Sequence, residues 1–154
     1  MGNLLKSNLI KLKIENKKLC CRIRVCLSNS CEVLLDNIAG ILYNQPAIII
    51  LEKDNNISDM VFVEFTKKVR LLANEFDSAL IILNRADIAY ITEADGLFLN
   101  YDGISVHDAI SIVGENSIIG VENSSLSGDA HIDFVVIGNM LVTEHKKLNI
   151  TEIT

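Results

Sequence analysis

The chain has 154 residues, which is enough for one domain with a substantial core. Apolar residues make up 49% of it and aromatic residues only 5%, so the core must consist mainly of Ile, Leu and Val, as in a parallel sheet covered on both faces. The net charge of −6 argues against nucleic-acid binding, and no apolar run is long enough to span a bilayer.

The charge is unevenly distributed. Residues 1–24 carry seven Lys or Arg side chains against one acid, Glu15, whereas the other 130 residues carry seven basic and nineteen acidic side chains. We interpret residues 1–18 as a basic, solvated N-terminal extension and residues 19–154 as the folded domain. Attraction of the extension to nucleic acid or anionic lipid is the alternative. No secretory signal opens the sequence, so we expect a cytoplasmic protein.

Four cysteines lie within twelve residues, and their spacing matches no paired C-x-x-C metal site. Strand alternation in residues 20–27 places two of them, with two arginines, on one face of a strand. We interpret all four as small, mostly buried thiols in a reducing compartment rather than as metal ligands. They are Cys20, Cys21, Cys26 and Cys31.

Short runs rich in Ile and Val predict six strands that are buried on both faces. Helical spacing of apolar residues separates them, most clearly in residues 58–73, where Ser58 or Asp59 is the expected N-cap, and from Ser105, the expected N-cap of another helix. The expected strands are 20–27, 47–51, 79–83, 96–99, 117–121 and 133–137.

Alternating strands and helices predict an α/β fold with a parallel sheet. Two architectures are consistent with this order. A doubly wound open sheet fits the length, whereas a β/α barrel fits the rhythm of the strands but normally needs about 200 residues or more.

Polar residues follow the buried strand 79–83 directly. Asn84 and Arg85 stand at its end, and a second strand begins at Gly96 after a short helical turn. The ends of buried parallel strands are the usual site-building positions of α/β proteins.

Five segments, in order, resemble the motifs of the thiamine phosphate synthase/TenI family, whose members are β/α barrels. The resemblance covers about residues 20–147 and implies a TIM-barrel-like fold with about six of eight β/α units present. The segments are residues 51–54 (LEKD), 82–89 (ILNRADIA), 94–103 (ADGLFLNYDG), 118–122 (IIGVE) and 133–146 (DFVVIGNMLVTEHK).

The resemblance implies a transferase of thiamine biosynthesis. The family couples hydroxymethylpyrimidine diphosphate with thiazole phosphate, uses Mg²⁺ and releases pyrophosphate. Its substrate-binding positions correspond here to Lys53, Asn84, Thr143 and Lys146. Its two metal carboxylates correspond to Asn84 and Gly103, so that Asn84 and the neighbouring Asp102 are only weak candidate ligands for a hard cation.

Other positions that contact diphosphate in the family are also changed, to Ile49, Leu51, Leu83 and Glu122. We therefore expect impaired or lost catalysis, with Mg²⁺ as cofactor if the chain is active. The alternative is a non-catalytic module that binds a phosphorylated ligand or another protein. The thiazole tautomerisation of the TenI branch is disfavoured because no His lies near Val121.

Several of these residues also have plain structural interpretations. Lys53 belongs to a cluster of surface charges, Arg85 and Asp87 are expected to form a structural pair, and Thr143 and Lys146 fit a solvated tail equally well. The three histidines are interpreted as surface residues. They are His107, His131 and His145.

Only seventeen residues follow Ile137, the end of the sixth expected strand. Without the last two β/α units, the sheet is expected to have two open edges and exposed aliphatic surface. We therefore expect a homo-oligomer, a partner chain that covers these edges, or a chain that is a piece of a longer protein.

Overall fold

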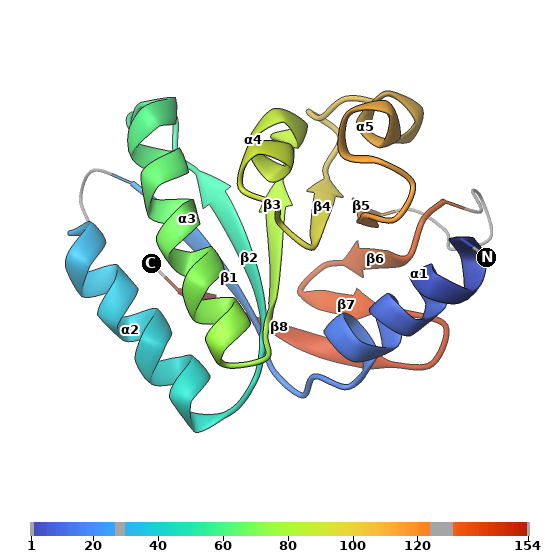
Figure 1. Ribbon diagram of the computed structural model, residues 1–154, viewed down its shortest axis with the longest axis horizontal. Coiled ribbons are helices and arrows are strands. Elements are labelled where there is room, and N and C mark those ends of the chain that lie inside the picture. The colour runs from blue at the N-terminus through green and yellow to red at the C-terminus, as the bar shows by residue number, and fades with distance from the viewer. Residues whose placement is uncertain (1, 27–29, 124–130, 154) are drawn as a thin grey trace.

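Eight strands form a closed barrel, in which each strand is hydrogen-bonded to its neighbours in chain order and β8 closes onto β1 (Figure 1). The computed structural model describes residues 2–26, 30–123 and 131–153. The strands are β1 (Cys20–Val25), β2 (Ile48–Lys53), β3 (Ala79–Leu83), β4 (Gly96–Leu99), β5 (Ile118–Glu122), β6 (Phe134–Ile137), β7 (Met140–Val142) and β8 (Lys147–Ile153).

The first six strands run parallel to one another, and they are the six that the sequence predicts. Among the described residues, four helices follow β1 to β4 in β/α order. Ser58 and Ser105 are confirmed as N-caps, because their side chains accept hydrogen bonds from the backbone N–H groups of Val61 and Asp108. The helices are α2 (Cys31–Asn44), α3 (Asp59–Glu75), α4 (Ala86–Ile91) and α5 (Val106–Val113).

Strand alternation divides the core into two clusters. One fills the barrel and includes Ile50, Phe98 and Phe134, whereas the other joins the outer faces of the strands to the helices and includes Ile49 and Leu51. The fold is therefore the TIM-barrel-like α/β fold that the resemblance implies, with its first six strands parallel.

The expectation of open sheet edges is wrong, because β7 and β8 close the barrel. β7 is antiparallel to β6 and to β8, and β8 is parallel to β1. Ile137 pairs with Met140, so Gly138 and Asn139 form a two-residue hairpin turn. Gly138 has φ +61°, the left-handed conformation that such turns require.

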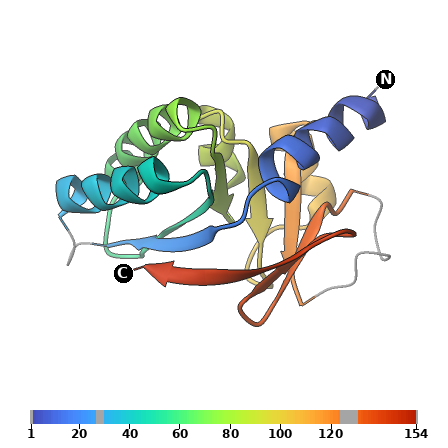
Figure 2. The ribbon, with the colours of Figure 1, turned by 90° about the horizontal axis from the view of Figure 1, so that it is seen from below.

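The hairpin of β7 and β8 needs no helix to cover it. Leu148 and Ile150 face the barrel core, whereas Lys147, Asn149 and Thr151 are exposed. In Figure 2 the helices lie on the opposite side of the molecule from β8. Antiparallel strands tolerate one solvated face, so this polar outer surface needs no covering helix.

The N-terminal residues lie against the amino end of the barrel. They form α1 (Gly2–Ile10) and a π-helical turn, η1 (Lys11–Glu15). Lys6 pairs with Asp133 at 3.0 Å, directly before β6, and Ile14 is buried in the barrel core. These contacts differ from the solvated extension expected from the sequence, while the domain boundary at residue 18 stays a prediction.

The predicted burial of the cysteines is confirmed for Cys20 and Cys21, whereas Cys26 and Cys31 are only partly buried. Burial raises the pKa of Cys20 to about 12 and also raises the pKa of Cys21, so both stay as thiols at neutral pH. Leu27, part of the same expected strand, lies outside the described residues. In the described part of the chain no helix is long and apolar enough to cross a membrane.

Candidate functional site

Charged and polar side chains gather at the carboxyl ends of β1 to β4, the end where β/α barrels carry their sites. On β1 and β2, Arg22 Nη2 lies 2.9 Å from Glu52 Oε1, and Arg24 Nη2 lies 2.9 Å from Asp54 Oδ1. The Arg22 guanidinium also lies 5.9 Å from the ring centre of Phe98, within range of a cation–π interaction. Both arginines are already neutralised by carboxylates.

Sequence reasoning placed Arg22 and Arg24 on one face of a strand but assigned them no role. The structure shows that this face is the barrel interior, because Cys20 on the same face belongs to the inner cluster. The alternation of β1 could have predicted that these arginines are paired, since charged residues that face inward are uncommon unless they have a partner of opposite charge.

Asn84 and Asn100, which follow β3 and β4, are joined by two hydrogen bonds. Asn84 Nδ2 donates to Asn100 Oδ1 at 2.7 Å, and the Asn100 backbone N–H donates to Asn84 Oδ1 at 3.0 Å. The Asp102 backbone N–H donates to the same Asn100 oxygen at 3.0 Å. A Cβ atom at Gly103 would lie 2.5 Å from Asn84 Oδ1, so the loop packs tightly on the amide.

A second polar group lies beside the Asn84–Asn100 pair. It consists of Lys53, Asp59, Arg85 and Asp87. Arg85 donates two bonds of 2.8 Å to the Asp59 carboxylate and a bond of 2.9 Å to Asp87. Hydrogen bonding to Arg85 lowers the pKa of Asp59 to about 2 and lowers that of Asp87, while the pKa of Arg85 is raised. The predicted Arg85–Asp87 pair is thus present, with Asp59 as an additional partner.

Lys53 leaves β2 on the side of the helices. It alternates with Ile49 and Leu51, which belong to the outer cluster, and its Nζ lies 3.7 Å from Asp59 Oδ1 at the start of α3. The structure therefore brings Lys53 near Arg85 through Asp59 but does not direct it into the barrel. Glu122, the last residue of β5, lies at the same end of the barrel.

Thr143 and Lys146 lie at the opposite end. β7 runs antiparallel to β6, so the turn after it returns to the amino end of the parallel strands. Lys146 Nζ donates to the carbonyl oxygens of Glu15, at 3.0 Å, and Lys17. The four predicted substrate-binding residues are consequently not assembled into one site.

The described residues do not fit a magnesium site. Both polar atoms of the Asn84 amide are engaged by Asn100, Gly103 has no side chain to donate, and Asp102 is exposed. Hard divalent cations require several oxygen ligands in a fixed geometry. Among residues 2–26, 30–123 and 131–153, no group of three or more His, Cys, Asp or Glu side chains could hold a metal ion.

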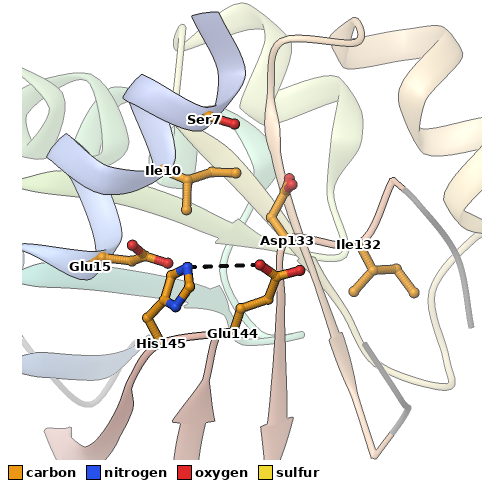
Figure 3. Close-up of a pocket in the computed structure, with 7 residues that line it drawn as sticks. All are labelled: Ser7, Ile10, Glu15, Ile132, Asp133, Glu144 and His145. Atoms are coloured by element: carbon orange, nitrogen blue, oxygen red, sulfur yellow. Dashed lines mark ion pairs between the residues drawn. The ribbon is translucent and has the colours of Figure 1, made fainter. Parts of the chain in front are cut away.

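A pocket of about 250 Å³ lies at the amino end, between the N-terminal helices and the turn after β7 (Figure 3). His145 Nε2 lies 3.8 Å from Glu144 Oε2 at its mouth, and His145 is exposed, as expected from the sequence. Burial raises the pKa of Asp133, which also accepts a hydrogen bond from Ile119 N–H. The lining residues are Ser7, Ile10, Glu15, Ile132, Asp133, Glu144 and His145.

Known proteins resemble this chain over most of its length. A family model described as thiamine monophosphate synthase matches residues 23–152. A thiamine-phosphate synthase of Alkaliphilus oremlandii is 28% identical over 105 residues, which are 65% of this chain and 50% of that protein. One of Haloarcula marismortui is 31% identical over 88 residues, which are 54% of this chain and 42% of that protein.

A solved structure, the thiamine phosphate pyrophosphorylase from Pyrococcus furiosus, matches with a TM-score of 0.62 at 23% identity. The match covers 79% of this chain and 61% of that chain, and it supports the fold alone. The chain spans about half the length of the curated relatives it matches. Because the family model covers nearly all of the barrel, the chain belongs to the thiamine monophosphate synthase family.

Proposed function

We propose that this chain is a thiamine phosphate synthase-like protein of thiamine biosynthesis in which the coupling of hydroxymethylpyrimidine diphosphate with thiazole phosphate is impaired or lost. The observation that carries the proposal is the closed amide pair of Asn84 and Asn100 above Gly103. Asn84 and Gly103 stand at the two positions that resemble the family's metal carboxylates, and the hydrogen bonds to Asn100 engage the Asn84 amide. An amide whose oxygen already accepts a hydrogen bond is a poor replacement for a carboxylate.

The distribution of cations supports the same conclusion. Stabilising a departing diphosphate requires positive charge aimed at the leaving group. Arg22, Arg24 and Arg85 are each bonded to carboxylates, so a diphosphate would have to displace these partners. Lys146, which resembles a late diphosphate-binding lysine, lies at the other end of the barrel.

The second candidate function is the non-catalytic binding of a phosphorylated pyrimidine or thiazole. Arg24 favours it, because its side chain is 55% exposed at the carboxyl end of β1. A guanidinium can exchange a carboxylate for a phosphate, since both accept its paired N–H donors. The protein is proposed to act in the cytoplasm on small phosphorylated molecules.

The test combines a coupling assay with a binding measurement on the same protein. Purified chain is incubated with both substrates and Mg²⁺, and thiamine phosphate is quantified against an active synthase from another source. We expect no product above the level without protein. Product formed by the chain at a rate comparable to that of the active synthase would contradict the proposed loss of catalysis.

Binding of pyrophosphate, measured by titration calorimetry, separates the two candidate functions. Arg24→Gln removes one guanidinium at the carboxyl end, and Lys18→Gln is the matched control because Lys18 is exposed at the amino end. Binding that is weakened by Arg24→Gln and unchanged by Lys18→Gln supports the phosphate-binding module. Equal binding by all three proteins contradicts it.

A further inference from the structure

The outer face of α3 carries a stripe of four exposed residues with helical spacing. Val61, Glu64, Lys68 and Leu71 follow one another at intervals of three, four and three residues, which places them on one side of the helix. The side chains of Val61 and Leu71 are 44% and 70% exposed. Between Val61 and Leu71 the stripe therefore has an apolar residue at each end and one pair of opposite charges, and Glu75 follows at the next interval.

A groove of about 320 Å³ runs beside this stripe, between α2 and α3. The two helices are in contact and lie side by side on the outside of the barrel (Figures 1 and 2). Met60 on the groove is 77% exposed and adds a flexible apolar side chain to its wall. The lining residues are Cys31, Glu32, Leu35, Met60, Val61, Glu64, Phe65 and Lys68.

We propose that this face of α2 and α3 binds a second copy of the chain, with the two α3 helices antiparallel about a two-fold axis at the level of residue 66. The axis lies midway between Val61 and Leu71 and also midway between Glu64 and Lys68. The partner's Leu71 then lies opposite Val61, and the partner's Lys68 lies opposite Glu64. The two-fold axis repeats both contacts on the other side.

The dimensions of the helix agree with this arrangement. Val61 and Leu71 are ten residues apart, or about 15 Å along α3. Leu71 itself does not line the groove, which lies beside the first half of the helix. In the antiparallel pair, the partner's Leu71 side chain packs into the groove beside Met60 and Val61.

Charge favours a second copy over an unrelated protein. An isologous interface must be complementary to itself, so each charge must meet its opposite after a two-fold rotation. Glu64 and Lys68 satisfy this condition because they lie at equal distances on either side of the axis. The proposal uses neither the carboxyl end of the barrel nor the proposed function.

Sedimentation velocity of the intact chain, from low micromolar to near-millimolar concentration, is the first test. We expect the mass to rise from 17.0 kDa toward twice that value as the concentration increases. Leu71→Glu should weaken dimerisation about tenfold or more, because it places a charge in the apolar groove. Ile112→Glu is the control, since Ile112 is 43% exposed on α5, and it should leave the association unchanged.

Exchange of the two charges gives a sharper test. Glu64→Lys alone and Lys68→Glu alone each place like charges opposite one another, so each variant should remain monomeric. Mixed in equal amounts, they restore both opposite-charge contacts and should form a mixed dimer. Glu115→Lys, an exposed change of equal charge away from α3, should dimerise like the original chain.

Three results would overturn the proposal. They are a chain that stays monomeric throughout the concentration range, a dimer that Leu71→Glu leaves intact, and charge variants that do not associate with each other when mixed. Circular dichroism of each variant shows that loss of association does not come from unfolding.

Discussion

Asn84 has φ +60°, a left-handed backbone conformation that asparagine tolerates better than most residues. This conformation turns the chain after β3 so that the side-chain amide meets Asn100 across the end of the barrel. The same residue that resembles a metal-binding position of the family thus serves as a structural link between two loops.

Replacement of Asn84 separates its backbone role from its side-chain role. Asn84→Ala loses two hydrogen bonds and adds left-handed strain, so the free energy of unfolding should fall by about 2–4 kcal/mol. Asn84→Gly loses the same bonds without the strain and should be about 1 kcal/mol more stable than the alanine variant. Urea unfolding measures both, and equal stability of the two variants would show that the backbone conformation carries no cost.

The Asp59 carboxylate provides a test by pH. Its pKa is about 2 in the folded chain, below the ordinary 3.8, mainly because it accepts hydrogen bonds from Arg85. A lowered folded-state pKa stabilises the protein above the unfolded value, and this stabilisation is lost as pH falls from about 4 toward 2.

We expect NMR titration to give the Asp59 carboxyl a pKa near 2 in the original chain and a higher pKa in Arg85→Gln, where Lys53 remains beside the carboxylate. Lys67→Gln, on the exposed face of α3, should leave the Asp59 value unchanged. The same pKa in the original chain and in Arg85→Gln would rule out this ion pair in solution.

At the scale of the elements, the packing of the barrel interior requires a small residue on β5 beside large aromatic residues on β4 and β6. Gly120 in β5 faces the ring of Phe134 in β6, and a Cβ atom at position 120 would collide with that ring. Phe134 in turn lies 6.1 Å, between ring centres, from Phe98 in β4. A glycine on β5 therefore lets two aromatic rings fill the centre.

Two glycine substitutions should have opposite effects. Gly120→Ala overpacks the interior and should lower the free energy of unfolding by about 1–3 kcal/mol. Gly40 lies inside α2, and no atom lies near the methyl group that alanine would add. Gly40→Ala should therefore raise the free energy of unfolding by about 0.5–1 kcal/mol. Denaturant unfolding checks both, and a neutral Gly120→Ala would show that the ring can move aside.

Lys146 links the turn after β7 to the N-terminal segment. Its ammonium donates to carbonyl oxygens of Glu15 and Lys17, just before β1. Lys146→Met keeps the aliphatic stem but removes these donors, so it should cost about 1–3 kcal/mol of stability and speed amide exchange in residues 11–18. Lys147→Met, on the solvated face of β8, is the matched control and should change neither quantity.

The sequence predicted the six parallel strands because each is a short, nearly unbroken Ile- and Val-rich run. It did not predict β7 and β8, although Leu148 and Ile150 alternate with Lys147 and Asn149, and Gly138-Asn139 is a recognised hairpin turn. Three-residue β7 is too short to show a period of its own. Both strands follow short turns rather than helices, so the β/α order of the earlier chain does not predict them.

For the whole molecule, the direction of β7 decides where the late family motif lies. A parallel continuation would keep Thr143 and Lys146 at the carboxyl end with Asn84, whereas the antiparallel hairpin moves them to the amino end. This separation could not be read from motif order, because spacing along the chain does not specify strand direction. Closure of the barrel and dispersal of the candidate site thus have the same structural cause.

NMR contacts between backbone protons of β6, β7 and β8 test this account most directly. We predict cross-strand contacts between Val136 and Leu141 and between Leu141 and Leu148, the pairs of the antiparallel register. We also predict contacts of the Lys146 side chain with residues 15–17. Contacts of Thr143 or Lys146 with Asn84 or Asn100 instead would contradict both the hairpin closure and the proposed dispersal of the site.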